Sequence, residues 1–211
     1  MQYDEGSKHT IMEDLKGPQV KEYMTAARDY CLFIDEAASF KPVELFESLQ
    51  NLLARVYSKT ALIKKPKYCY EDLPQKFVQD TEYALIHDRL QGIIVKFNGT
   101  GSLKGKSNSM DIISFSLAEA LTDIYQELKD SYKLYEVSLT QAMNDAIWSS
   151  RDNFEKQWGL QLIETLQSMH QLLYGHKLTT SQLEFDEDSD EPEEKDESWF
   201  SEEDDIPNDE E

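Results

Sequence analysis

The sequence predicts an all-α fold, a helical bundle of about five helices that is followed by a disordered acidic C-terminal tail. Apolar residues recur at steps of three and four along most of the first 175 residues, and this spacing places them on one face of a helix. Prolines and capping residues stand where these patterns begin. Acidic residues concentrate at the other end of the chain, where the stretch from Glu184 onward holds 17 of them and one basic residue, Lys195.

The first two helices are expected to begin at Pro18 and Pro42, because proline is favoured at the first helical position, where its missing N–H costs no hydrogen bond. They are expected over residues 18–38 and over residues 42 to about 60. The short link between them predicts antiparallel neighbours. Their apolar stripes are Val20, Tyr23, Met24, Ala27, Tyr30, Cys31, Ile34 and Ala38, and then Leu45, Phe46, Leu49, Leu52, Leu53, Val56 and Tyr57.

Two loops enclose the third helix. Residues 63–79 contain two prolines and no helical period, and residues 98–109 are rich in glycine and serine. Between them a helix is expected to begin at Asp80 or Thr81, either of which can cap it. The segments on either side of the second loop, residues 93–97 and 111–115, could pair as a minor β-hairpin, although both also fit helix ends.

Capping boxes indicate two further helices. In this motif a serine caps the first turn and a Glu or Gln three residues later reaches back to it. Ser116 and Glu119 precede an apolar stripe that runs to about Glu136, and Ser138 and Gln141 precede the longest stripe of the chain. The sequence therefore predicts helix starts at both serines.

The last helix is expected over residues 139–173, with Gly175 as its C-terminal cap. A straight helix of this length would measure about 52 Å at ~1.5 Å per residue. A domain of this size has a radius of gyration of only about 15 Å. Either the helix overhangs the bundle, or Gly159 serves a bend or a close approach of backbone.

The charge distribution divides the chain into a flexible N-terminus (residues 1–16), a helical bundle domain (17–178) and a disordered acidic tail (184–211). The tail carries a net charge of −16 out of −21, so it cannot bury enough apolar area to offset its ordering entropy. The rest of the chain is only mildly acidic. Direct nucleic-acid binding by phosphate neutralisation is excluded, because it needs a surplus of Lys and Arg on one face.

A soluble, cytoplasmic protein is expected. Cys31 and Cys69 do not form a disulfide framework, and neither has the spacing of a metal-binding or redox motif. The N-terminus lacks the apolar run of a signal peptide. No stretch approaches the roughly 20 apolar residues that a membrane span needs.

The helices over residues 116–136 and 154–170 resemble the bacterial family called domain of unknown function 5063, which is similar in carrying a DIY…DLK helix and then an FE-x-x-WG…LH helix. The resemblance covers roughly residues 20–175 and implies a mostly helical bundle, with no activity established. The family often has histidines just before the Trp-Gly pair and two residues after it, where this chain has Gln157 and Gln161. The residues that carry the resemblance are Asp123-Ile124-Tyr125, Leu128-Lys129, Phe154-Glu155, Trp158-Gly159 and His170.

Carboxylates line one helical face at steps of four: Glu119, Asp123 and Glu127. Di-metal sites in helical bundles also need Glu-x-x-His motifs, and the sequence has neither this motif nor His-Glu-x-x-His. A solvated or partly paired face is therefore expected, with no metal and no cofactor. The glycine cluster at residues 99–105 lacks the spacing of a phosphate-binding loop, so we interpret it as an ordinary loop.

A polar network is expected between the last two helices. A buried carboxylate among hydrogen-bond donors can fix how two helices register. The same residues could instead line a pocket for a small ligand or substrate. Both readings concern one set of side chains: Asp123, Tyr125, Arg151, Glu155, Trp158 and His170.

The tail holds an aromatic pair, Trp199 and Phe200, between acidic runs. Such a pair suits a short anchor that docks on a basic partner protein. The leading hypothesis is therefore a non-enzymatic interaction module. The alternatives are a ligand-binding protein or enzyme with the pocket named above, and an inhibitor that mimics nucleic-acid charge. The sequence leaves the oligomeric state open.

Overall fold

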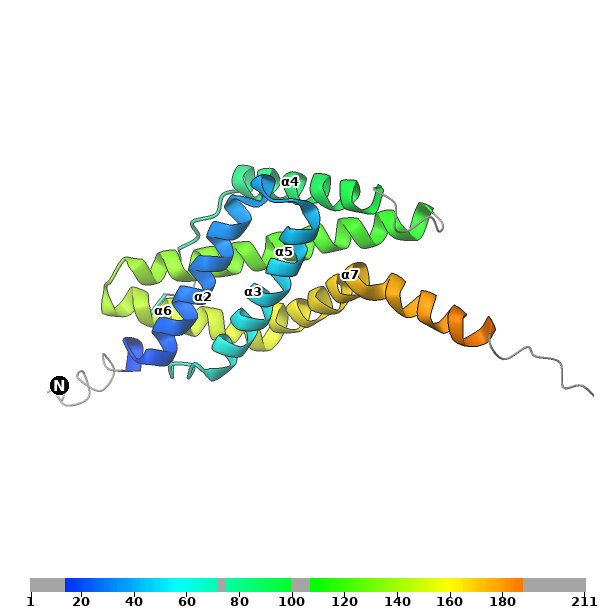
Figure 1. Ribbon diagram of the computed structural model, residues 1–211. Helices are drawn as coiled ribbons and strands as arrows, with labels where there is room; N and C mark the ends of the chain where they lie inside the picture. The colour runs from blue at the N-terminus through cyan, green and yellow to red at the C-terminus, as the bar shows by residue number, and fades with distance from the viewer. Residues whose placement is uncertain (1–13, 72–74, 100–106, 188–211) are drawn as a thin grey trace, which may run out of the picture. The chain divides into compact units, whose positions relative to one another are not determined.

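The computed structural model describes residues 14–71, 75–99 and 107–187. In these residues all regular secondary structure is helical, which confirms the predicted all-α class (Figure 1). The elements are α2 (Pro18–Asp35), a short 3₁₀ turn (Ala37–Ser39), α3 (Pro42–Leu62), α4 (Asp80–Gly99), α5 (Ser107–Glu136), α6 (Thr140–Asn153), a π-helical turn (Phe154–Trp158) and α7 (Gly159–Glu187).

The chain divides into two units, Met1–Gly175 and His176–Glu211, and every contact described below lies within the first. Helix α5 packs against α2, α4 and α6, and α2 packs against α3. Helices α2 and α3 run antiparallel, as their short link predicts (Figure 1). Prolines occupy the first position of both.

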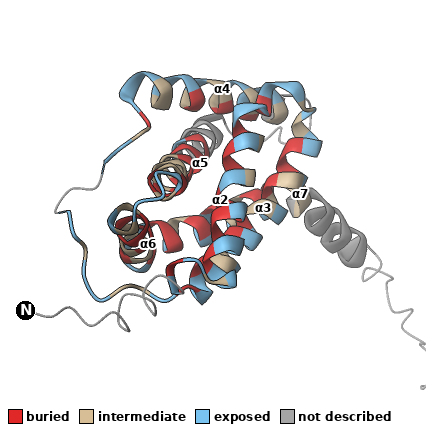
Figure 2. Cartoon of the chain, turned by 90° about the vertical axis from the view of Figure 1, so that its left-hand side faces the viewer, coloured by how far each residue is buried: buried red, intermediate tan, exposed pale blue. Residues whose placement is uncertain are grey.

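The core forms where the apolar stripes of these helices meet. Figure 2 shows that α2, α3 and α4 each bury one side and expose the other. The predicted stripes of α2 and α3 supply fully buried residues such as Tyr30, Ile34, Phe46 and Leu49. Each large apolar side chain that is fully buried contributes about 1.5–3 kcal/mol relative to exposure, so these stripes hold the helices together.

The β-hairpin expected across residues 98–109 is wrong. Residues 93–97 lie in α4 and residues 111–115 lie in α5. In α4 the four-residue step continues through this segment, so that Ile94 is 1 % exposed and the ring of Phe97 packs edge-on against Phe46 of α3, 5.1 Å between centroids. A strand would break this packing.

The structure also corrects three helix ends. Helix α5 begins at Ser107, so Ser116 lies in its interior. Helix α6 begins at Thr140, and Ser138 adopts φ = 63° in the reversal between α5 and α6. Its hydroxyl donates to the carbonyl of Glu136 rather than to a helix N-terminus. Gly175 does not end α7, which continues to Glu187.

The long C-terminal stripe is interrupted by the π-helical turn at Phe154–Trp158. The N–H of Gly159 donates to the carbonyl of Phe154, five residues back. A Cβ on Gly159 would lie 2.5 Å from that carbonyl oxygen and 2.9 Å from the Phe154 ring. The expected close approach therefore occurs at Gly159, and it accompanies a T-shaped contact between Phe154 and Trp158.

Gly159→Ala is expected to destabilise the protein by roughly 1–3 kcal/mol, because the added methyl group overpacks against backbone. The melting temperature should fall by about 2–4 °C for each kcal/mol. The matched control is Gly92→Ala at an exposed position of α4, where a Cβ meets nothing within 4 Å. Replacing a glycine inside a helix by alanine should stabilise the protein by up to about 1 kcal/mol. Thermal unfolding of both variants checks the prediction, and equal shifts of the same sign would contradict it.

Candidate functional site

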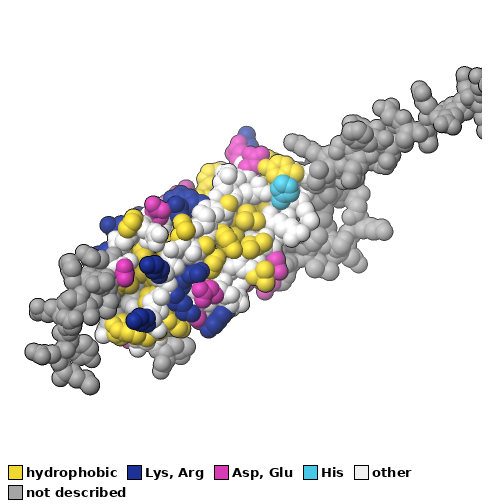
Figure 3. Space-filling view, turned by 90° about the horizontal axis from the view of Figure 1, so that it is seen from below, with side chains coloured by type: hydrophobic (Ala, Val, Ile, Leu, Met, Phe, Trp, Pro, Cys, Tyr) yellow, Lys and Arg dark blue, Asp and Glu magenta, His cyan; other side chains and the backbone are white. Residues whose placement is uncertain are grey.

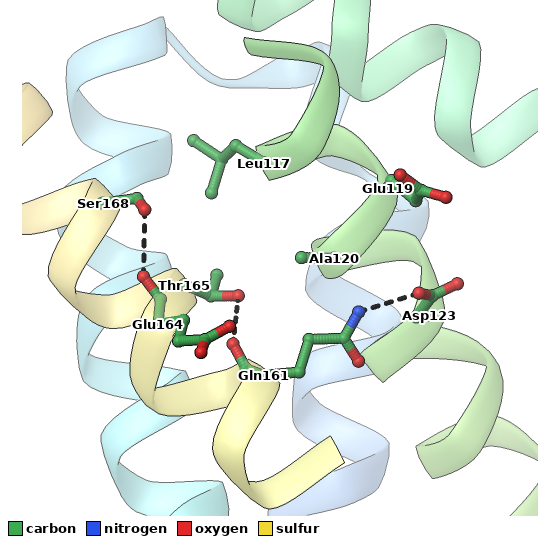
Figure 4. A pocket seen from close by; sticks show the side chains of 8 residues that line it. All are labelled: Leu117, Glu119, Ala120, Asp123, Gln161, Glu164, Thr165 and Ser168. Atoms are coloured by element: carbon green, nitrogen blue, oxygen red, sulfur yellow. Dashed lines mark hydrogen bonds between the residues drawn. The ribbon is translucent and has the colours of Figure 1, made fainter. Parts of the chain in front are cut away.

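Helices α5 and α7 face each other across a pocket of about 250 Å³ (Figure 4). The spacing of three and four residues on each helix brings these side chains to one face. The lining residues are Leu117, Glu119, Ala120 and Asp123 from α5, and Gln161, Glu164, Thr165 and Ser168 from α7.

Asp123 is the fixed carboxylate of this pocket. Its Oδ1 accepts a hydrogen bond from the Tyr83 hydroxyl of α4 at 2.6 Å, and its Oδ2 accepts one from Gln161 Nε2 at 2.8 Å. Burial raises the pKa of Tyr83 well above its ordinary value, and the carboxylates of Asp123 and Glu119 raise it further. The phenol therefore remains a donor at neutral pH, and the two bonds hold the carboxylate in place.

The other polar groups of the pocket are hydrogen-bond acceptors. Gln161 Oε1 is buried and has no hydrogen-bond partner among the described residues. The hydroxyls of Thr165 and Ser168 donate to carbonyls of their own helix, at 2.7 and 2.9 Å, so each can offer a ligand only a hydrogen-bond acceptor. The exposed carboxylates of Glu119 and Glu164 lie at its rim. With no Lys or Arg in this lining, the pocket is complementary to a cation that carries several N–H donors.

Only one of the six residues predicted for a common site lines this pocket, and that residue is Asp123. Tyr125 lies on another side of α5, where its hydroxyl shares its one proton between Asp35 at 2.6 Å and Glu82 at 2.9 Å. Lys129 joins the same cluster by an ion pair of 2.6 Å with Glu82. This cluster connects α2, α4 and α5, which indicates a role in helix register.

Arg151 of α6 and Glu155 of the π-helical turn form a separate ion cluster. Their side chains pair at 2.9 Å, and the Arg151 guanidinium lies 5.2 Å from the centroid of the Phe154 ring. Glu155 also lies 3.6 Å from Lys65, which pairs with Asp152 at 2.6 Å. These contacts join α6 to the segment that follows α3.

Trp158 is 1 % exposed and belongs to the packed core, where its indole N–H donates to the carbonyl of Ser150 at 3.3 Å. His170 is exposed, with its ring 4.9 Å from that of Tyr174. The six predicted residues therefore do not assemble into one pocket. Trp199 and Phe200 lie outside the described residues.

The pocket residues of α7 were missed because sequence alone does not show which neighbour a polar helical face meets. Gln161, Glu164, Thr165 and Ser168 share one face at helical spacing, and this pattern was the signal that could have found them. Within the described part of the chain, no group of His, Cys, Asp and Glu side chains is arranged to hold a metal ion. In the same residues, no helix has the length and apolar character to cross a membrane.

Asp152→Asn tests the ion cluster of α6 through pH. Hydrogen bonds from Lys156 and Lys65 lower the pKa of Asp152, so its stabilising contribution is fully present above the ordinary value of about 4. It is lost as pH falls through the lower folded-state value. In urea unfolding, wild type should exceed the variant in stability at neutral pH, with the difference vanishing in acid. A control, Asp88→Asn at a side chain 84 % exposed, should show little difference, and a pH-independent gap for Asp152→Asn would contradict the prediction.

The comparisons with known proteins agree with this architecture. The family described as "Domain of unknown function (DUF5063)" matches residues 16–175. The crystal structure of protein BF1032 from Bacteroides fragilis is similar at 25% sequence identity, with a TM-score of 0.65, over 76% of this chain and 96% of that one. No protein with a curated description matches the chain. On the family match over most of its length, the chain belongs to the DUF5063 family.

Proposed function

We propose that this protein is a non-enzymatic interaction module that binds a basic segment of a partner protein. The α5–α7 pocket receives a cationic side chain of that segment, and the acidic tail attracts the segment from a distance. The observation that carries the proposal is the acceptor lining of the pocket: the carboxylates of Glu119, Asp123 and Glu164 and the unpartnered Oε1 of Gln161.

The size and chemistry of the pocket favour one arginine side chain. A volume of about 250 Å³ lies below the ~300–1,000 Å³ of pockets that hold a whole small molecule. A guanidinium presents five N–H donors in a rigid fork. Such a fork can meet the fixed carboxylate of Asp123 and the amide oxygen of Gln161 together, while Glu119 and Glu164 at the rim offset its charge.

The tail supplies most of the net charge of the chain, −16 of −21. In the described residues, charges of both signs are interspersed with apolar side chains on the face seen in Figure 3. A strongly anionic segment raises the association rate of a basic partner, and salt screens this effect. Trp199 and Phe200 give the same segment an apolar anchor for that partner.

Peptide binding tests the pocket. The probe is a fluorescein-labelled peptide with arginines among neutral residues, compared with the same peptide carrying uncharged citrulline. The double variant Glu119→Gln/Glu164→Gln should weaken binding of the arginine peptide by roughly 2- to 30-fold, since exposed ion pairs contribute about 0.2–1 kcal/mol each. Asp123→Asn should weaken it at least about tenfold, because it removes a charged hydrogen-bond acceptor.

The matched control is Glu44→Gln/Glu136→Gln, which removes the same charge from exposed positions on α3 and at the end of α5. Fluorescence anisotropy gives the dissociation constants, and thermal unfolding confirms that each variant is folded. Equal losses in the control, or equal binding of the citrulline peptide, would exclude the pocket as the arginine site.

Association kinetics test the tail in the full-length protein. Neutralising its second acidic run, with Glu202→Gln, Glu203→Gln, Asp204→Asn and Asp205→Asn together, should lower the association rate constant for the arginine peptide at low salt. The dissociation rate constant should hardly change. Asp123→Asn should do the reverse, because a group in the binding pocket acts mainly on dissociation. A tail variant that associates as fast as wild type at low salt would remove the tail from the proposal.

A further inference from the structure

A second cavity, of about 450 Å³, lies between α5, α6 and the segment that precedes α4. It has a polar end and an apolar wall and falls within the size range of small-molecule sites. The lining residues are Gln75, Lys76, Glu127, Asp130, Ser131, Leu134, Ala146, Trp148, Ser149, Ser150 and Asn153.

The segment that bears Gln75 and Lys76 is fixed to α5 by Asp130. A single carboxylate oxygen, Oδ1, accepts the backbone N–H groups of Phe77 at 2.6 Å and of Val78 at 2.8 Å. These bonds position one wall of the cavity without using any group of α6. The cavity is therefore a built feature of the fold, held by charge-assisted hydrogen bonds.

Glu127 is the polar group available to a ligand. The hydroxyls of Ser131 and Ser150 are already engaged with the Tyr23 hydroxyl, from the core side. Glu127 Oε2 accepts a hydrogen bond from Asn153 at 3.0 Å, and within the described residues the structure shows no hydrogen bond to Oε1. Burial raises the pKa of Glu127 and the neighbouring charge of Asp130 raises it further, while the Asn153 hydrogen bond and the charge of Lys76 act in the opposite direction.

The charged residues of the cavity lining indicate the charge of a ligand that would suit it. Glu127 and Asp130 contribute two negative charges and Lys76 one positive charge, which leaves a net charge of −1 that one ammonium group would balance. Leu134, Ala146 and Trp148 offer an apolar wall for the rest of a ligand. We propose that this cavity binds a small organic monoamine with an apolar body, its ammonium group on Glu127 and its body against Leu134 and Trp148.

This site is independent of the proposed arginine pocket. None of its lining residues is shared with the α5–α7 pocket, and the two differ in chemistry. The first pocket is lined by acceptors and fits a donor-rich guanidinium, whereas the second combines one unbalanced charge with apolar surface. If the arginine peptide fails to bind, the proposal of an amine site is unaffected. If the amine fails to bind, the proposal of an arginine pocket is unaffected.

Calorimetric titration of the full chain tests the proposal with three probes of similar shape: 2-phenylethylamine, 2-phenylethanol and 3-phenylpropionate. The amine should bind more tightly than the neutral alcohol, and the carboxylate should not bind. Glu127→Gln should weaken the amine at least about tenfold, because the charged partner is lost, while the alcohol should bind unchanged. Glutamine can still accept the Asn153 hydrogen bond, so the variant should remain folded.

Glu136→Gln on the same helix is the matched control and should leave all three titrations unchanged. A second variant, Ser149→Leu, fills the cavity from its rim and should abolish binding of the amine and the alcohol alike. The proposal is overturned if no probe binds, if the amine has no advantage over the alcohol, or if Glu127→Gln binds the amine as wild type does. It is also overturned if Glu119→Gln/Glu164→Gln abolishes amine binding, because the amine would then occupy the other pocket.

Discussion

Buried tyrosine hydroxyls on α2 set the constraint on which the bundle depends. Tyr23 and Tyr30 are both fully buried, and a hydroxyl that is buried without a partner costs about 1–3 kcal/mol in proteins. Tyr30 donates to the carbonyl of Leu121 at 2.9 Å, and Tyr23 meets Ser131 and Ser150. These partners fix the axial position of α2 on α5 and reach α6, so one set of bonds aligns three helices.

Helix α5 lines both pockets. The tyrosine hydrogen bonds fix its position relative to α2 and α6. Asp123 and Glu127 lie one turn apart on it, yet they meet different neighbours: Gln161 of α7 in one case and Asn153 of α6 in the other. The predicted row of carboxylates therefore exists in the sequence but not as one site. Tyr125, two residues from Asp123, points to a third environment formed with α2 and α4.

Periodicity predicts well the helices whose buried face can be identified from the spacing of apolar residues within that one helix. The stripes of α2 and α3 needed only the spacing of residues such as Tyr30 and Phe46. Features that depend on a neighbour were not predictable. The contact of Phe97 with Phe46 decides between helix and strand over residues 93–97, and Ser138 uses its hydroxyl within the reversal rather than as a cap. For the same reason Asp123 was found as a candidate, while its partners Tyr83 and Gln161 were not.

The π-helical turn at Phe154–Trp158 sets how far α7 is rotated about the helix axis relative to α6. An α-helix advances about 100° per residue, and a π turn accommodates one residue more than an α turn does. Winding the same five residues as an α-helix, with none removed, would rotate every later side chain by about that angle. Gln161 would then swing away from Asp123, while α6 would stay as it is. The direction in which the pocket-lining side chains of α7 point is thus set by a five-residue stretch that lines no part of the pocket.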